Sequence, residues 1–547
     1  MQNAARLNAK CKMQNAKLQT AYDGQVRSAL LAIGLPALVV AVCGGAYALT
    51  LAPGVTWANG GLDSGELIAA AETGGVPHPT GYPTYMLLAR LVLLLPISDP
   101  ALAVTLLSPL AATLTALVVG DMVRRWSAAE EPWASAAGMS AALGLALAPL
   151  FWSQAVIAEV YSLGALFAAL LLHAALRSAL EPERVAPSLT TSILAGAALG
   201  AQVTLLPFVL TWVAIASRAR GRRAWGGKLA RIGGGVALGL LVYLYLPLAA
   251  RANPPINWGD ASSWQGFWWL VSGRLYAGMA FGLPPEQLGG RLLAWGALLL
   301  QQFGWLGVLV GGLGFVRGGR PVGALRWLTL GLALTAVLFA LGYNSVDAQV
   351  HLIPAVVIGA LWVGLGVEVI LGFVAVRQPK FTPLVALALV VGLLWPAPFT
   401  AQQVDASGDR RAISYAAAIL EQAPADAIVL TDDDRSSFPL WHYHFGRGQR
   451  PDLRLVTGPL LGFAWYRASL RATYPDLRLP ELAPRGWEAA LAEAPGRSGP
   501  LCHAVAAPVA LVSCGEEPEP EPFGARKPRK AANHREMATH VQSYGRR

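Results

Sequence analysis

Charged residues are scarce in this chain of 547 residues, and that scarcity sets its class. Asp, Glu, Lys and Arg together make up 14% of the sequence, against about 25% in an average soluble protein. Hydrophobic residues reach 54%, and the mean hydropathy is +0.46. This composition excludes a disordered chain and an ordinary soluble enzyme, and it predicts a polytopic membrane protein.

Cysteine is also scarce, with four residues in the whole chain. That number is too small for a disulfide-rich secreted module, and no Cys or His group has the spacing of a zinc site. Cys11 and Cys43 lie near the N-terminus, and Cys502 and Cys514 lie near the other end. The second pair could form one disulfide if its region lies outside the cytoplasm, or it could remain two thiols, and the spacing leaves both possibilities open.

Basic residues exceed acidic ones, giving a net charge of +10, but we expect no nucleic-acid partner. Most basic residues flank apolar segments, as orienting charges do in membrane proteins. The long basic segment before the first apolar run predicts a cytoplasmic N-terminus and an uncleaved first transmembrane helix. Basic residues then cluster in alternate loops, and the loops between them, which we assign to the outer side, hold few: Arg90, Arg251, Arg274 and Arg291.

The apolar runs predict an all-α polytopic protein with about eleven transmembrane helices. They lie at roughly 30–51, 101–123, 134–151, 155–176, 188–201, 203–217, 232–250, 292–316, 322–342, 349–375 and 382–397. A further apolar run at 80–97 would invert the later charge pattern if it crossed the membrane, so we expect an interfacial or partly embedded helix there.

The C-terminal part differs in kind from the rest. A helix-like run at Arg411–Gln422 and a strand-like run at Ala427–Thr431 predict a small extracytoplasmic α/β domain. We therefore divide the chain into four parts: a cytoplasmic segment 1–29, a transmembrane domain 30–398, an outer domain 399–514 and a low-complexity, disordered tail 515–547.

Acids are unevenly distributed, and acids near a membrane interior need an explanation. Asp63, Glu66 and Glu72 lie within ten residues in the first outer loop. Asp63 precedes a predicted helix that begins at Ser64, so it could simply cap that helix. The alternative is a general base at the membrane surface.

Polar residues in the next loops could face the same cavity. His78 lies in a loop stiffened by prolines and could bind phosphate or act as an acid, or it could be a structural residue of a rigid turn. Glu159 ends an apolar helix and could face the cavity or extend to the interface. Arg251 is a basic residue at an outer edge, where phosphate binding would explain it. Tyr343, Asn344, Asp347 and His351 could complete this cavity.

Two further patterns suggest metal sites only superficially. Asp432–Asp434 follows the predicted strand and is more simply an acidic turn, and His442 and His444 are more simply structural. We therefore assign no metal site. The aromatic residues of the 251–290 loop suit a sugar-stacking surface or, more simply, an interfacial belt.

The motifs themselves resemble a known family. The segments Asp63-Ser-Gly-Glu, His78-Pro-Thr-Gly-Tyr-Pro, Ala158-Glu-Val-Tyr and Asn253-Pro-Pro-Ile-Asn-Trp-Gly-Asp are similar to those of bacterial members of a protein O-mannosyltransferase-like family of GT-C glycosyltransferases. The resemblance implies a GT-C fold whose site faces away from the cytoplasm, and a polyprenyl-phosphate-linked sugar, commonly mannose, as donor. It implies Asp63 as the key acid with Glu66 next. Substrate-binding residues would be His78, Tyr82, Glu159, Arg251, Asn257, Trp258 and His351.

The expected reaction is an inverting transfer to an extracytoplasmic acceptor, with Asp63 as base and the lipid phosphate as leaving group. A metal is unnecessary in principle, because cationic side chains can neutralise a lipid monophosphate leaving group, and the polyprenyl-phosphate sugar is expected as the donor substrate. The expected partners are membrane lipids, the lipid-linked donor and a protein or glycan acceptor, in a bacterial cytoplasmic membrane. A transporter or flippase and a non-catalytic envelope scaffold are the alternatives. A transporter should show paired repeats and interrupted helices near the midplane, whereas the unusual residues here gather at one face.

Overall fold

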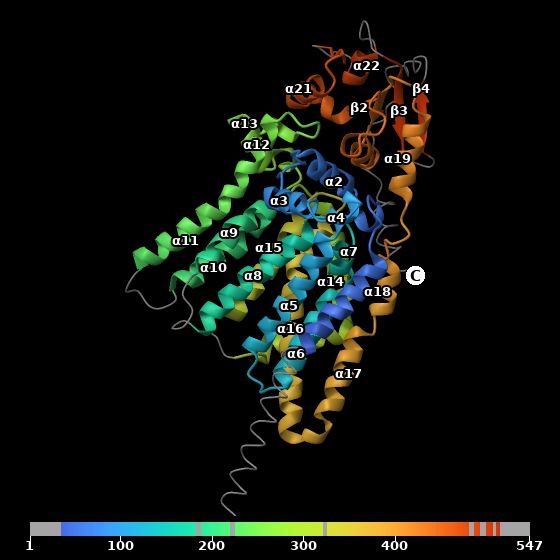
Figure 1. Ribbon diagram of the computed structural model, residues 1–547. Coiled ribbons are helices and arrows are strands. Elements are labelled where there is room, and N and C mark those ends of the chain that lie inside the picture. Colours follow the sequence, from blue (N-terminus) through green and yellow to red (C-terminus); the bar gives the residue numbers. More distant parts are fainter. Residues whose placement is uncertain are drawn as a thin grey trace, which may run out of the picture.

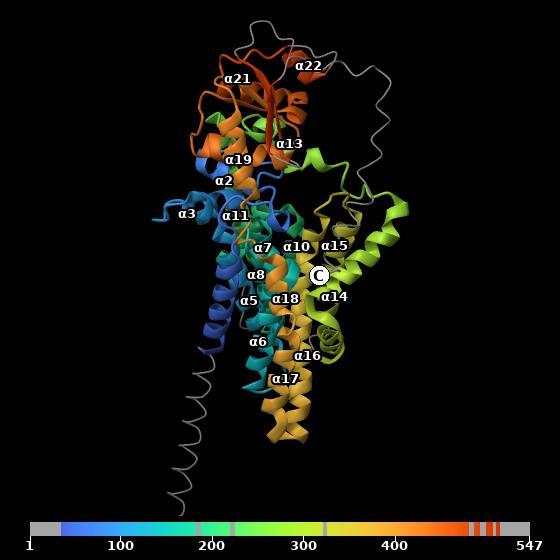
Figure 2. The ribbon, with the colours of Figure 1, turned by 90° about the vertical axis from the view of Figure 1, so that its right-hand side faces the viewer.

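The computed structural model describes residues 34–181, 188–218, 225–320, 325–480, 486–492, 499–506 and 510–514. Long helices form an elongated bundle, and a smaller region of helices and strands covers one of its ends (Figure 1). The same arrangement is visible after a 90° turn (Figure 2). We call the covered end of the bundle the site end and the opposite end the far end. The predicted segments 1–29 and 515–547 lie outside the described residues.

The predicted apolar runs form the long helices of the bundle. In chain order these are the helix Gly34–Thr50, α5 (Leu107–Trp126), α6 (Trp133–Ala146), α7 (Pro149–Ala155), α8 (Tyr161–Leu180), α9 (Leu189–Ala201), α10 (Leu206–Arg218), α11 (Trp225–Leu240), α12 (Tyr245–Arg251), α14 (Pro285–Arg317), α15 (Leu325–Gly342), α16 (Ile353–Arg377), α17 (Thr382–Leu394) and α18 (Ala397–Val404).

Seven helical stretches among the described residues are long and apolar enough to cross a membrane, or eight if the bent pair α6 and α7 forms one span. Three shorter apolar helices lie at the remaining expected positions: Gly34–Thr50, Leu189–Ala201 and Val203–Arg218. All eleven expected segments are therefore helical. Fewer than eleven are long enough to cross a membrane, because these three helices are short.

The surface and the packing of the bundle both suit a lipid environment. Large apolar side chains such as Leu293, Trp305 and Val376 are mostly exposed on its flanks. Inside, α14 and α16 cross so closely that a Cβ at Gly314 would lie 1.9 Å from the carbonyl oxygen of Trp362. Small residues allow such close helix crossings in membranes. The chain is an integral membrane protein.

Short helices and turns fill the site end. They are α2 (Ser64–Thr73), α3 (Pro83–Val92), α4 (Pro100–Thr105), η4 (Trp258–Asp260), α13 (Trp264–Val271), η5 (Arg274–Tyr276) and η6 (Ala348–Leu352). Figures 1 and 2 place α2 and α3 between the bundle and the C-terminal region. Helix α3 has ten residues and is not among the candidate spans, which agrees with the expectation that the apolar run at 80–97 does not cross the membrane.

The C-terminal region contains a four-stranded sheet with the strand order β2-β1-β3-β4. Strand β1 pairs in parallel with β2 and β3, and β4 runs antiparallel to β3. The elements are α19 (Arg411–Gln422), β1 (Ile428–Thr431), α20 (Asp434–Trp441), the π-helical turn η8 (His442–Gly446), β2 (Arg454–Thr457), η9 (Gly458–Gly462), α21 (Ala464–Thr473), α22 (Trp487–Ala492), β3 (Leu501–Val505) and β4 (Leu511–Cys514). The expected helix, strand and small α/β fold are confirmed.

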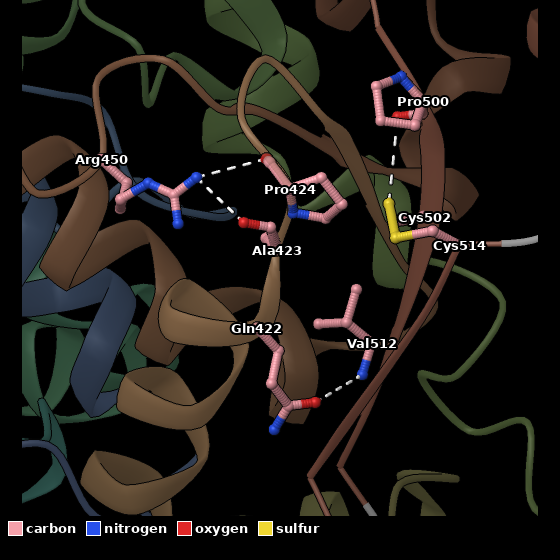
Figure 3. The surroundings of a disulfide bond; sticks show 8 residues. All are labelled: Gln422, Ala423, Pro424, Arg450, Pro500, Cys502, Val512 and Cys514. Carbon is pink, nitrogen blue, oxygen red and sulfur yellow. Dashed lines mark hydrogen bonds between the residues drawn. A yellow bond between two sulfur atoms is a disulfide. The ribbon is translucent and has the colours of Figure 1, made fainter.

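A disulfide joins the neighbouring strands β3 and β4 of this sheet. Cys502 on β3 and Cys514 on β4 face each other in the strand register and are bonded. Figure 3 shows the bond beside Gln422 of α19, whose side-chain oxygen accepts a hydrogen bond from the Val512 backbone. Of the two possibilities that the sequence left open, the structure has the disulfide.

Candidate functional site

Helix α2 begins directly after Asp63, and its whole first half is buried. Asp63 occupies the N-cap position, but its side chain makes no capping hydrogen bond. The neighbouring Ser64 hydroxyl does not cap the helix either, because its Oγ accepts a hydrogen bond from the Thr56 backbone N–H and donates to the Gly61 carbonyl, both in the preceding segment. The Asp63 carboxylate, whose side chain is 27% exposed, therefore remains free to serve another partner.

His78 lies against the first turn of α2. Its backbone N–H donates to Glu66 Oε1 at 3.1 Å, and its Nδ1 makes a very short contact with Glu66 Oε2. Glu66 is fully buried. The turn that carries His78 is fixed by Gly81, whose backbone N–H donates to the His78 carbonyl. The two motifs that begin at Asp63 and at His78 are thus joined by a buried ion pair.

The other ring nitrogen of His78 faces the remaining site residues. His78 Nε2 lies 3.8 Å from the Asp63 carboxylate and 3.2 Å from the Tyr82 hydroxyl. Burial by itself would lower the pKa of His78, but the charges of Glu66 and Asp63 raise it to about 10. His78 is therefore an imidazolium at neutral pH, held between two carboxylates.

The site has more acids than nearby cations. Burial raises the pKa of Asp63, His78 lowers it, and the charges of Glu66, Asp434 and Asp347 raise it again, to about 7. Glu159 is 3% exposed, and burial followed by the charge of Asp63 raises its pKa. A carboxylate whose pKa lies near neutrality can accept a proton at physiological pH.

The loop after α12 pairs with the His78 loop through the backbone. The Val76 N–H donates to the Ile256 carbonyl at 2.8 Å, and the Trp258 N–H donates to the Val76 carbonyl at 3.1 Å. This places the Trp258 ring 6.4 Å from the His78 ring. Asn257 Oδ1 and Trp258 Nε1 are both buried without a hydrogen-bond partner among the described residues. They are available to a polar ligand.

Two predicted site residues lie apart from this cluster. Arg251 ends α12 with an exposed side chain and makes no hydrogen bond or ion pair with another described residue. His351 lies in η6 and packs against the rings of Tyr161, Phe339 and Tyr343, with centroids 6.0, 4.9 and 5.2 Å away. The roles of Arg251 and His351 in substrate binding remain predictions.

Sequence reasoning did not assign a site role to Asp434, which belongs to the C-terminal region. It is the first residue of α20, a helix that contacts α2. Its charge acts on both Asp63 and His78, and desolvation followed by the charge of Glu66 raises the pKa of Asp434. The acidic run at 432–434 marked the position, but only the fold brings it to α2. Tyr276, one of the aromatic residues of the 251–290 loop, was given no place in the site, and its ring lies 6.3 Å from that of His78.

The simpler readings of the acidic turn and of the two histidines agree with the contacts found. Asp433 caps α20 through a capping box with Ser436. His442 pairs with Glu72, and His444 contacts the Gln449 carbonyl and the Tyr474 hydroxyl. No group of three or more His, Cys, Asp or Glu residues in the described part of the chain is arranged to hold a metal ion.

The geometry brings together a proton acceptor, a buried cation and unpaired polar atoms at one end of a membrane bundle. Asp63 can take a proton from a hydroxyl, and the imidazolium of His78 can stabilise negative charge that develops beside it. Asn257 and Trp258 offer an acceptor and a donor in an aromatic setting. This combination suits transfer of a polar group more than passage of a solute through the bundle.

The structural class of the protein follows from its fold. The chain resembles ArnT from Cupriavidus metallidurans, whose structure was solved with undecaprenyl phosphate bound, with a TM-score of 0.52 and 13% identity over 81% of this chain and 89% of that one. At this level of identity the likeness concerns the fold alone. The protein is a polytopic membrane protein of the GT-C fold.

Sequence comparison then narrows the class. Residues 63–223 match the family model described as the Protein O-mannosyl-transferase TMEM260 N-terminal domain. The chain is 26% identical over 456 residues to the mouse protein O-mannosyl-transferase TMEM260, covering 77% of this chain and 62% of the relative. It is 22% identical over 492 residues to the Dictyostelium discoideum protein O-mannosyl-transferase tmem260, covering 79% and 58%. The chain thus spans about three fifths of these relatives, and the resemblance drawn from the motifs is confirmed.

Proposed function

We propose that this protein is a membrane glycosyltransferase that moves a sugar from a polyprenyl-phosphate donor to an extracytoplasmic acceptor. The observation that carries the proposal is the placement of Asp63. It is the first residue of the matched family region, it precedes a buried helix, and it lies beside the His78–Glu66 pair. A carboxylate with a pKa of about 7 in that position has the properties of a general base.

Mannose is the proposed sugar and a protein Ser or Thr hydroxyl the proposed acceptor. Both are suggested by the mouse and Dictyostelium relatives, which are named protein O-mannosyl-transferases. Undecaprenyl phosphate bound to ArnT, a protein of the same fold, agrees with a polyprenyl-phosphate donor. The proposed setting is a bacterial cytoplasmic membrane, with the N-terminus in the cytoplasm and residues 399–514 forming a domain outside.

The proposed mechanism is an inverting displacement in one step. The acceptor hydroxyl oxygen attacks the anomeric carbon, the bond from that carbon to the phosphate oxygen breaks, and the lipid phosphate leaves with the electron pair. Asp63 takes the proton of the attacking hydroxyl. The His78 imidazolium, together with the exposed guanidinium of Arg251, would stabilise the charge on the leaving phosphate.

Sugar transfer by the purified protein tests this proposal. Wild type and Asp63→Asn would receive radiolabelled polyprenyl-phosphate mannose and an extract of envelope proteins, with Asp121→Asn as a carboxylate-to-amide control at the far end. Label on protein with wild type and the control, but not with Asp63→Asn, is the expected result. Equal label with all three would keep the enzyme and remove Asp63 from the chemistry. No label with any of them would count against the transferase and favour a transporter or a scaffold.

A further inference from the structure

Helix α2 is held at both of its ends, and the second attachment has no role in the proposed reaction so far. Asp63 and Glu66 lie at its start, and Glu72 lies one residue before its end. Glu72 Oε2 contacts His442 Nδ1 of η8 at 2.9 Å, and its other oxygen lies 3.7 Å from Arg447. The Glu72 and His442 side chains are 8% and 4% exposed. A buried acid–histidine pair thus links the site helix to the C-terminal region.

The first turn of α2 lies directly on α20 of the same region. A Cβ added at Gly65 would lie 2.5 Å from the carbonyl oxygen of Phe438, so the two backbones meet without a side chain between them. Gly446 is equally close to Glu72, because a Cβ there would lie 2.1 Å from Glu72 Oε2. Any movement of α2 would therefore have to displace α20 and η8 as well.

The segment before α2 is fixed by the C-terminal region too. Asp409 accepts hydrogen bonds from Thr56 Oγ1 at 2.6 Å and from the backbone N–H groups of Trp57 at 3.0 Å and Ala58 at 2.8 Å. The Arg435 guanidinium lies 4.4 Å from the Trp57 ring centroid. The first loop and α2 thus contact the C-terminal region at several points, and the buried Glu72–His442 pair is the link at the end of α2 farthest from Asp63.

We infer that His442 is a positioning residue for the proposed transferase. It acts through Glu72 to fix α2, and α2 in turn holds Asp63 and Glu66 against His78. The inference rests on the proposed function. It makes the C-terminal region part of the reaction machinery, rather than a separate domain that only meets the acceptor. Precise placement matters because a shift of about 1 Å in a reacting group can cost about a hundredfold in rate.

The experiment compares three variants of the full-length protein. His442→Leu removes the pair, and His442→Asn keeps an N–H donor in the place of Nδ1. His444→Leu is the matched control, because His444 lies in the same buried turn, but its hydrogen bonds with described residues are to Gln449 and Tyr474 of the C-terminal region. Three quantities would be measured: the amide hydrogen exchange of residues 64–73, and kcat and KM for transfer from polyprenyl-phosphate mannose.

The positioning role predicts a specific pattern. His442→Leu should speed exchange in α2 and lower kcat by about tenfold to a hundredfold with little change in KM, and His442→Asn should restore most of both. His444→Leu should leave exchange in α2 at the wild-type rate. The inference would be overturned by wild-type exchange in α2 with His442→Leu, or by equal effects of the two leucine variants. If wild type transfers no sugar, the proposed function fails, while the exchange measurement still decides whether His442 holds α2.

Discussion

Two clusters of charged residues lie at opposite ends of the bundle and differ in how many basic groups pair with the central acid. At the far end, Asp121 of α5 contacts Arg124 at 3.0 Å, Arg125 at 2.5 Å and His173 of α8 at 2.9 Å. At the site end, Asp63 has one cationic nitrogen within 4 Å among the described residues, that of His78 at 3.8 Å.

The difference lies in the balance of charge. Three basic groups surround one acid at the far end, whereas at the site end His78 already pairs with Glu66, and the acids Glu159, Asp347 and Asp434 also act on Asp63 or on each other. An excess of buried acid destabilises a fold, and such perturbed acids gather at functional sites. The comparison therefore favours a stabilising role for the far cluster and supports the proposed catalytic role of the site cluster.

Replacing each central acid by its amide gives the largest expected contrast. Asp63→Asn keeps the shape of the side chain but removes the proton acceptor, so transfer should fall by about a hundredfold to ten-thousandfold. Asp121→Asn should leave transfer within a few fold of wild type. Radiolabel transfer at saturating donor measures both. Similar losses in the two variants would mean that the comparison does not separate chemistry from stability.

The second largest effect should be the loss of stability when His78, the cation at the site end, is removed. His78→Gln leaves Glu66 fully buried without its charged partner, and breaking a buried pair in this way costs about 3–5 kcal/mol. The free energy of unfolding, measured by denaturant titration in detergent, should fall by that order. The double variant Glu66→Gln with His78→Gln should recover much of the loss, because two neutral amides can bond to each other. A single variant as stable as wild type would contradict the buried pair.

The pKa of His78 adds a pH signature to this prediction. It rises from an ordinary value of 6.5 to about 10 in the folded protein. The protonated form is therefore favoured by folding, and the pair contributes its full stability below about pH 6.5 and loses it as the pH rises through about 10. His78→Gln should remove that alkaline loss of stability, which the same titration at several pH values would measure.

Most of the bundle could be predicted from the sequence, because length and apolar composition determine which segments can span a bilayer. The run Arg411–Gln422 matches α19 for the same kind of reason, since its apolar residues repeat along one helix face. Asp63, Glu66 and His78 could be predicted as candidates because acids and a histidine are unusual in such a chain. That they lie together is a finding of the structure.

Contacts between distant segments could not be predicted. Asp434 reaches the site because α20 packs on Gly65, across more than 350 residues of sequence, and no local pattern indicates such a pairing. The Glu72–His442 contact was missed for the same reason. Arg251 is a different case: its position at a predicted outer edge suggested phosphate binding, and the structure gives it an exposed side chain at the end of α12, so its role in phosphate binding remains a prediction.

The rate of transfer should fall by about tenfold per pH unit below the pKa of Asp63. Asp63 accepts a proton only when it is deprotonated, and its pKa is raised to about 7. The rate should therefore be flat above that pH and fall by about tenfold for each unit below it. Transfer assays between about pH 5 and pH 8 measure this, and Asp121→Asn should show the same acidic limb. A rate that stays constant over that range would contradict Asp63 as the base.

Removing one cation from the far cluster should have the smallest effect. The Arg124 side chain is 44% exposed, and solvent screens such a pair, so Arg124→Ala should lower the free energy of unfolding by about 0.2–1 kcal/mol. Asp121 would keep Arg125 and His173, so no buried charge is left alone. The same titration that detects the loss in His78→Gln should barely register this one. Comparable losses of unfolding free energy in the two variants would show that the far cluster depends on each of its cations as strongly as Glu66 depends on His78. The two ends would then differ only in the solvent exposure of their charged side chains.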